Sequence, residues 1–155
     1  MAIHTSRAMV TSSEGLAVRA VAREFEIAID EPRAVGGTDT GMTPSELVLC
    51  ALGACQTILA KAFAKRWGLE IQECRVELEG DLDPDGYRGL SDACKGFSQI
   101  RYRFRIRSDA SDDRIRAYVR FIDGISPVRD TIANPVQLIL EDVIVEKNVD
   151  GRQPV

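Results

Sequence analysis

The chain has 155 residues, which is enough for one domain with a hydrophobic core. Hydrophobic residues make up 45% of it, charged residues make up 28%, and the net charge is −4, so its charge does not favour nucleic acid or an anionic membrane as a partner. The four cysteines follow no zinc-like pair spacing, and the single histidine, His4, excludes a site built from several histidines. We therefore expect one domain, residues 1–155, without a metal site.

Signals for a membrane or for export are also missing from the sequence. No apolar run approaches the roughly 20 residues of a membrane helix, and residues 1–15 lack the basic start and apolar block of a signal peptide. We therefore expect a cytoplasmic protein with reduced thiols and no membrane partner. The arginines of "RYRFRIR" at 101–107 alternate with apolar residues, which indicates a half-buried strand with a basic outer face.

The N-terminal part, residues 1–30, is expected to form strands. The predicted strands lie at 2–10 and 16–29, and the turn signal "SSEG" separates them. A Gly-rich loop follows, which contains neither of the glycine patterns that bind phosphate.

A central helix is predicted within residues 43–68. "TPSE" marks its start, with Thr43 as N-cap and Glu46 completing a capping box, and Gly68 marks its end after Trp67. The stretch from Leu47 to Cys55 carries no charge, and a helix that is apolar on every face is expected to be buried on every face. A helix of about 24 residues spans about 36 Å, which is as long as a domain of this size is wide. We therefore expect a second copy of the chain to help cover it.

The remaining part, residues 69–148, is expected to hold further strands and a second helix. The sequence predicts strands at 70–80 and 97–107 and a last strand at 136–147. It also predicts a helix at 111–123, with Ser111 as its N-cap and Gly124 at its end. The order of elements is that of an α+β fold without regular βαβ repeats.

The segment "DLDPDGYRGLSD", residues 81–92, matches much of the calcium-binding EF-hand loop. Aspartates occupy alternate positions, Gly86 stands at the sharp turn and Asp92 stands at the twelfth position. Arg88 at the eighth position and the predicted flanking strands argue against this interpretation. "DPDG" also forms an ordinary turn between strands, and we expect that role here.

The motifs "GGTDTGMTPSELVLCALGACQTIL" and, much later, "ISPVRDTI" resemble the superfamily of osmotically inducible protein C (OsmC) and organic hydroperoxide resistance protein (Ohr). The resemblance extends over nearly the whole chain. It implies an intertwined homodimer in which long central helices pack together and antiparallel sheets from both chains wrap around them.

The resemblance also implies a chemistry. Active members are thiol peroxidases in which a thiolate on the central helix attacks the O–O bond of a small hydroperoxide and becomes a sulfenic acid. A second cysteine then forms a disulfide with it, and a thiol reductant, such as a lipoyl group, reduces that disulfide. An arginine held by a glutamate keeps the first thiol ionised, and no metal or organic cofactor takes part.

Two of these partners differ in this chain. Cys55 matches the peroxide-attacking cysteine, but Ser126 stands where the resolving cysteine is expected, so the chain resembles an OsmC-like subgroup that lacks it. Ser45 stands at the position of the glutamate, and Glu46, one place further along the helix, points about 100° away.

The resemblance leaves several residues open for the missing roles. Arg19, Arg23, Arg33 and Arg129 could each supply the cation. Among the other cysteines, Cys50 is too far round the helix for a disulfide with Cys55, and Cys74 fits a structural place on a strand. Cys94, in a predicted loop, is the remaining substitute for the resolving cysteine.

Three interpretations of Cys55 therefore remain. In the first, Cys55 is a peroxide-reactive thiolate that an external thiol or Cys94 resolves. In the second, the protein is a non-peroxidatic dimer that binds a small apolar ligand at the subunit interface, and Cys55 is part of the pocket wall. In the third, Cys55 only packs the helix seam.

Overall fold

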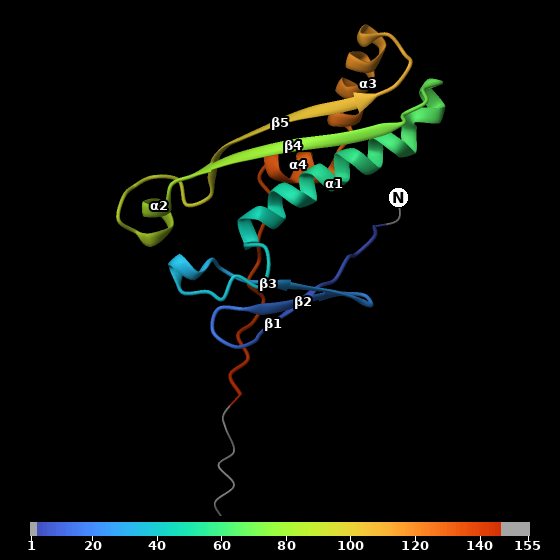
Figure 1. Ribbon diagram of the computed structural model, residues 1–155. Coiled ribbons are helices and arrows are strands. Elements are labelled where there is room, and N and C mark those ends of the chain that lie inside the picture. Colours follow the sequence, from blue (N-terminus) through green and yellow to red (C-terminus); the bar gives the residue numbers. More distant parts are fainter. Residues whose placement is uncertain (1–2, 147–155) are drawn as a thin grey trace, which may run out of the picture.

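The N-terminal third forms a three-stranded antiparallel sheet in the computed structural model, which describes residues 3–146 (Figure 1). Its strands are β1 (Met9–Ser12), β2 (Val18–Ala22) and β3 (Phe25–Ile29). The expectation of a single strand at 16–29 is wrong, because a tight turn at Arg23, with a φ of 56°, separates β2 from β3. A left-handed residue of this kind is typical of a two-residue hairpin turn.

The central helix begins and ends where the sequence predicts. Helix α1 (Pro44–Ala64) continues into the 3₁₀ turn η2 (Lys65–Trp67), and Gly68 closes it in the left-handed conformation with a φ of 58°. The capping box is confirmed. The Thr43 hydroxyl accepts a hydrogen bond from the Glu46 backbone, and the Glu46 carboxylate accepts one from the Thr43 backbone at 2.8 Å.

Helix α1 is buried on only one face of the single chain. Leu52, Gly53 and Gln56 are buried, and a Cβ on Gly53 would lie 2.8 Å from the Leu78 side chain of the adjacent strand. The opposite face exposes apolar residues, with Ile58 65% exposed. The expectation of a helix buried on every face is therefore wrong for one chain, because none of residues 3–146 covers that side.

By length and composition, Pro44–Trp67 is long and apolar enough to cross a membrane, which the sequence analysis did not expect. In the structure, however, α1 packs against a strand and two helices of the same chain. The core helix of a soluble protein meets the same two criteria, so the length and composition of this helix are weak evidence that it spans a membrane.

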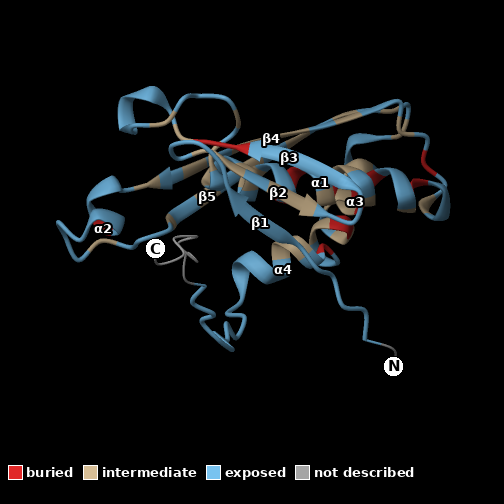
Figure 2. Ribbon diagram, turned by 90° about the horizontal axis from the view of Figure 1, so that it is seen from below, coloured by how far each residue is buried: buried red, intermediate tan, exposed pale blue. Residues whose placement is uncertain are grey.

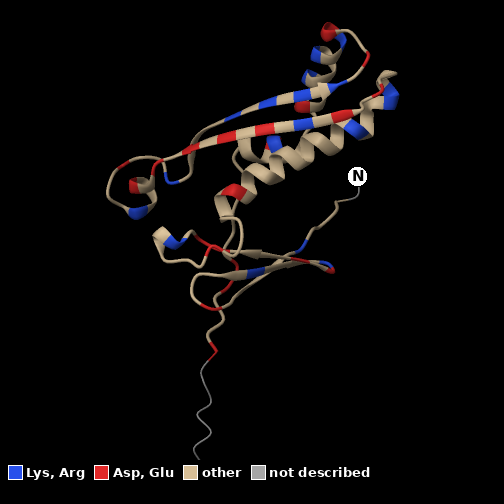
Figure 3. Cartoon of the chain, viewed as in Figure 1, with Lys and Arg blue, Asp and Glu red and all other residues tan. Residues whose placement is uncertain are grey.

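A long antiparallel hairpin lies along α1 on the side opposite to the N-terminal sheet (Figure 1). It consists of β4 (Glu73–Leu82) and β5 (Phe97–Arg107). Their inner residues, such as Val76 and Phe104, pair across the strands. On the outer face, mostly acidic residues of β4 lie opposite arginines of β5 (Figure 3). The basic outer face of residues 101–107 is therefore confirmed, and its arginines pair with carboxylates of β4, among them Asp81.

The segment 81–92 forms the tip of this hairpin. Asp83 caps the short helix α2 (Pro84–Arg88) by accepting from the Asp85 backbone at 2.9 Å, and Asp81 pairs with Arg101. Two of the carboxylates expected of a calcium loop, those of Asp81 and Asp83, are thus engaged with protein groups, and the segment follows a strand rather than a helix.

Two further helices complete the fold. They are α3 (Asp112–Gly124) and α4 (Pro127–Ala133). α3 packs on the second half of α1, and the buried core joins Tyr118 and Ile122 of α3 to Ala60 and Ala64 of α1. Few residues are fully buried in the single chain, and exposed surface dominates its ribbon (Figure 2).

The expectation of a last strand at 136–147 is wrong within the described residues, and residue 147 lies outside them. Residues 135–146 form neither helix nor strand and lead away from the β4–β5 hairpin (Figure 1). A strand needs a neighbour for its backbone hydrogen bonds, and no strand of the described chain pairs with this segment. Its apolar side chains are exposed, with Leu138 93% exposed.

The Gly-rich loop is held by one buried carboxylate. Asp30, which is 2% exposed, follows β3 and precedes the turn η1 (Arg33–Val35). It accepts hydrogen bonds from the Glu31 backbone and from the backbone and hydroxyl groups of Thr38 and Thr40, at 2.6 to 3.2 Å. The Thr38 hydroxyl above all, together with these other donors, holds the pKa of Asp30 well below its ordinary range.

Asp30→Asn is expected to lower the free energy of unfolding at neutral pH. A carboxylate whose pKa is lowered by folding stabilises the fold above its unfolded pKa, and this contribution is lost as the pH falls toward the folded pKa. Urea denaturation from about pH 7 to about pH 2 should therefore show a difference from the wild type that shrinks below about pH 4. The exposed Asp92→Asn is the matched control. A difference that stays constant over this range would contradict the assignment.

Candidate functional site

Cys55 lies half-buried on α1, beside the start of α4. Ser126 is the N-cap of α4, is 2% exposed, and donates a hydrogen bond from its hydroxyl to the Cys55 sulfur at 3.3 Å. The same hydroxyl oxygen accepts from the Arg129 backbone N–H, also at 3.3 Å. The structure thus brings together Cys55 and Ser126, which are separated by 71 positions in the sequence.

The carboxylate of Asp123 connects the elements around this pair. One of its oxygens accepts from the Gln56 amide and from the Tyr102 hydroxyl, each at 2.8 Å. The other oxygen lies 3.0 Å from Nε of Arg129. Since Gln56 directly follows Cys55, this carboxylate ties the cysteine helix to β5 and to the α3–α4 corner. Sequence reasoning missed Asp123, Tyr102 and Gln56.

The protonation of this network is set by its surroundings. Burial, followed by the hydrogen bond to Asp123, raises the pKa of Tyr102, so its hydroxyl keeps its proton and remains a donor. The hydrogen bond to Tyr102 and the charge of Asp123 raise the pKa of Arg129. Arg129 is connected to Cys55 through the Ser126 hydroxyl and the Arg129 backbone, and its charge is balanced by Asp123.

A cavity of about 550 Å³ adjoins the network between α1, β5 and α4. Its volume is within the range of sites for small organic ligands. Tyr102 and Arg129 form a polar part of its wall. The remaining wall is mostly apolar: Val48, Leu52, Phe97, Ser98, Gln99, Ile100, Ile132 and Ala133.

The other expected cations do not reach Cys55 within the described chain. Arg19 on β2 pairs with Glu26 of β3 at 2.7 Å, and both side chains are half-exposed. Arg23 lies over the ring of Phe25, 4.8 Å from its centroid, and Arg33 is exposed in η1. Among residues 3–146, the hydrogen bond to Cys55 comes from Ser126 and not from a guanidinium.

Cys94 is not placed to resolve Cys55 either. It lies in the loop beside α2, where its backbone carbonyl approaches Gly86 so closely that an added Cβ would stand 2.6 Å from it. Gly53 lies against Leu78 of β4, and the hairpin tip begins three residues further, or about 10 Å along the strand. A disulfide would require the tip to leave its place.

The two other cysteines have separate surroundings. Cys74 on β4 packs against the core, and burial raises the pKa of its thiol, which agrees with a structural place. Cys50 is exposed on α1, and its sulfur lies 3.7 Å from that of Met42. Within the described part of the chain, no group of three or more His, Cys, Asp or Glu side chains is arranged to hold a metal ion.

Solved structures with this arrangement define the class of fold. The chain is similar to an OsmC-like protein from Mycoplasma pneumoniae, with a TM-score of 0.74 and 20% identity over 84% of this chain and 88% of that one. It is also similar to an organic hydroperoxide resistance protein OsmC from Legionella pneumophila (TM-score 0.60, 17% identity, 85% and 91% covered). A further relative is the organic hydroperoxide resistance protein OhrB of Bacillus subtilis (TM-score 0.56, 18% identity, 83% and 90% covered). The expected α+β fold, a long helix with antiparallel sheets, is confirmed.

The sequence itself assigns the family. A family model described as OsmC-like protein matches residues 37–141, which is more than half of the chain. The chain therefore belongs to the OsmC-like protein family, and the resemblance noted in its motifs is confirmed. No curated protein matches the chain.

Proposed function

We propose that this protein reduces organic hydroperoxides with Cys55 as the attacking thiolate and an external thiol as the reductant. The observation that carries the proposal is the hydrogen bond from the buried Ser126 hydroxyl to the Cys55 sulfur. A hydroxyl that donates to sulfur stabilises negative charge on it. The apolar cavity that adjoins this network offers room for the organic part of a hydroperoxide.

The reaction balances in three steps. The Cys55 thiolate attacks one oxygen of the O–O bond, the bond breaks, and the alcohol leaves after taking up a proton, which oxidises Cys55 to a sulfenic acid. An external thiol then attacks this sulfur, so that a mixed disulfide forms and water leaves. A second external thiol attacks the mixed disulfide and releases Cys55 as a thiol. Ser126 cannot form a disulfide, and Cys94 is held at the hairpin tip, so the external thiol takes the resolving role.

The protein acts as a homodimer in this proposal. The exposed face of α1 carries apolar or small residues at helical spacing, at Val48, Ala51, Ala54 and Ile58, and a second α1 would cover them. Residues 136–145 present exposed apolar side chains on an unpaired extended backbone. A second copy with its own sheet would pair this backbone. The same copy would bring another Arg19 and Arg33, either of which would supply a cation for Cys55.

Ile58→Glu is expected to shift the protein from dimer to monomer. The substitution would bury a carboxylate between two helices, which costs several kcal/mol unless the charge is paired. Size-exclusion chromatography with light scattering should show a monomer at concentrations where the wild type is a dimer. Leu90→Glu, at a residue 72% exposed at the hairpin tip, should leave the dimer intact. A monomeric wild type would contradict this part of the proposal.

The cytoplasm is the compartment that this chemistry requires. The four cysteines are free in the structure, and reduced thiols persist where glutathione and related thiols are abundant. The same pool of thiols would supply the external reductant.

A second function is favoured by the ion pair between Arg129 and Asp123. Because this carboxylate balances the guanidinium, Cys55 gains no net positive charge from it within one chain. A dimer that binds a small apolar ligand in this cavity, with Cys55 as a structural residue beside it, is this second function.

Turnover of cumene hydroperoxide by the purified full chain with a dithiol reductant separates the two functions. Peroxide loss should depend on protein concentration and should disappear in Cys55→Ser. The matched variant Cys50→Ser, which removes an exposed thiol from the same helix, should retain it. Peroxide loss that is equal in the wild type and Cys55→Ser would exclude the peroxidase and leave the ligand-binding function.

A further inference from the structure

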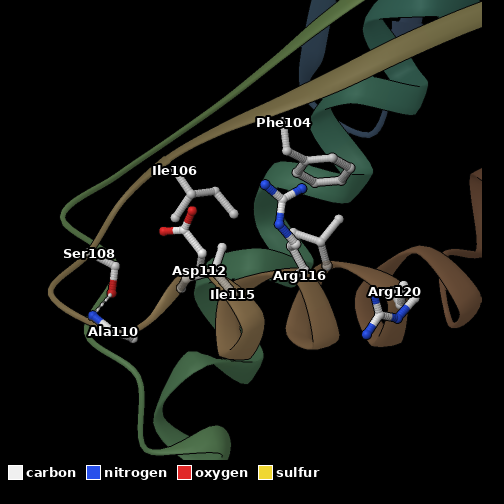
Figure 4. A pocket seen from close by; sticks show the side chains of 9 residues that line it. Phe104, Ile106, Ser108, Ala110, Asp112, Ile115, Arg116 and Arg120 are labelled. Carbon is white, nitrogen blue, oxygen red and sulfur yellow. Dashed lines mark hydrogen bonds between the residues drawn. The ribbon is translucent and has the colours of Figure 1, made fainter.

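A second cavity, of about 490 Å³, lies between β5 and α3 and shares no lining residue with the cavity beside the Cys55 network. Figure 4 shows side chains from the strand and the helix facing each other across it. Phe104 and Ile106 come from β5, and Ile115 and Val119 come from α3. All four are only partly buried, so apolar surface remains available to a ligand.

The cavity results from the way α3 packs. The helix turns Tyr118 and Ile122 onto α1, where they complete the core. Ile115 and Val119, four residues apart, form the neighbouring stripe along the strand side of the helix. The cavity lies between this stripe and the inner side chains of β5. Arg116 and Arg120 of α3 also line it.

These two arginines differ from those on the outer face of β5. Arg101, Arg103, Arg105 and Arg107 each lie within 4.0 Å of a carboxylate. In residues 3–146, Arg116 and Arg120 have no ion pair. They lie one helical turn apart on α3, and both line the cavity.

The lining also carries one acidic side chain, Asp112, which precedes Arg116 by four residues and so lies one helical turn from it. Asp112 lies beside Ile106, and the guanidinium of Arg116 lies toward Phe104 (Figure 4). The cavity is therefore lined by five apolar and four polar residues, and it carries two arginines against one carboxylate. A ligand that fills it with an apolar body gains by burial, and an anionic head group gains by pairing with a guanidinium in a two-pronged contact.

We propose that the β5–α3 cavity binds a small apolar carboxylate, such as a medium-length fatty acid, at a site separate from Cys55. The volume is in the range of small-molecule sites. The arginines select the carboxylate over a neutral or cationic head group, and the apolar side chains of the lining contact the alkyl part of the ligand. This binding does not require peroxide chemistry, so it stands or falls independently of the proposed function.

Calorimetric titration of the full chain with decanoate tests the site. Decanoate should bind to the wild type and to Cys55→Ser with the same affinity. Decanol and decyltrimethylammonium carry a comparable alkyl chain with a neutral or cationic head group, and they should bind at least about tenfold more weakly. The double variant Arg116→Gln/Arg120→Gln should weaken decanoate binding by at least about tenfold. The matched pair Arg103→Gln/Arg105→Gln, which changes the same residue type on the outer face of β5, should bind like the wild type.

Three results would overturn the proposal. The first is a lack of saturable decanoate binding, or equal binding of the three probes. The second is a loss of binding in Arg129→Gln with normal binding in the Arg116→Gln/Arg120→Gln variant, which would place decanoate in the cavity beside Tyr102. The third is a changed dimer dissociation constant in the Arg116→Gln/Arg120→Gln variant, measured without ligand, which would make this face an interface between copies.

Discussion

Ser126→Cys is expected to give Cys55 an intramolecular disulfide partner. The Ser126 oxygen already lies 3.3 Å from the Cys55 sulfur, and a disulfide needs the two sulfurs to approach to about 2.05 Å, a shift of about 1 Å. A tethered thiol acts at an effective concentration of about millimolar or higher. It should therefore capture the Cys55 sulfenic acid roughly a thousandfold faster than a micromolar external thiol does.

Peptide mass spectrometry after treatment with one equivalent of cumene hydroperoxide measures this outcome. The variant should yield a peptide pair joined through positions 55 and 126, and the wild type should yield a sulfenic acid or a mixed disulfide at Cys55. The variant in a Cys94→Ser background should behave identically. Exclusive linkage of position 126 to another cysteine, or two unreacted thiols, would contradict the geometry of the site.

Tyr118→Ala is expected to be the most destabilising single substitution among those considered. The side chain is fully buried, its ring packs 5.4 Å from that of Trp67, and its hydroxyl donates to the Ala60 carbonyl at 2.6 Å. Removing a buried aromatic ring leaves a cavity and costs about 3–5 kcal/mol. The contact joins α3 to α1, so its loss should also loosen the corner that carries Asp123 and Ser126.

Two further variants separate packing from hydrogen bonding in this contact. Tyr118→Phe keeps the ring and loses the hydroxyl, so its cost should be about 1 kcal/mol. Tyr87→Ala, at a residue 53% exposed at the hairpin tip, should change the free energy of unfolding by less than about 0.5 kcal/mol. Urea denaturation gives all three values, and a Tyr118→Ala cost below that of Tyr118→Phe would contradict the packing account.

Local signals predicted the elements whose formation depends on local sequence. The capping box at Thr43 and the left-handed Gly68 bound the central helix as expected, since caps act through neighbouring backbone groups. The strand at 97–107 followed from strict alternation of apolar and charged residues. The turn at Arg23 was missed because an arginine carries no strong signal for a positive φ.

The errors at α1 and at residues 136–146 concern apolar surfaces that residues 3–146 leave uncovered. An apolar helix face and an apolar alternating segment predict burial, but neither says which molecule supplies the cover. In the described chain, residues 135–146 are unpaired and one face of α1 is exposed.

The site could be predicted only in part. Cys55 and Ser126 were found through motifs, whereas Asp123 was not, because its partners Gln56 and Tyr102 lie 67 and 21 positions away. A polar network of this kind exists only after β5 and α3 have packed on α1. Its sequence signal is limited to single polar residues in apolar surroundings, which many strands and helices contain.

The most direct test of the central claim is a titration of Cys55 with cumene hydroperoxide, without a reductant, in which dimedone traps the sulfenic acid for peptide mass spectrometry. The account predicts that the Cys55 peptide is labelled in proportion to added peroxide until one equivalent is reached, and that Cys55→Ser gives no such labelling at this position. Cys55 that stays reduced under excess peroxide while the exposed Cys50 and Cys94 become oxidised would contradict it.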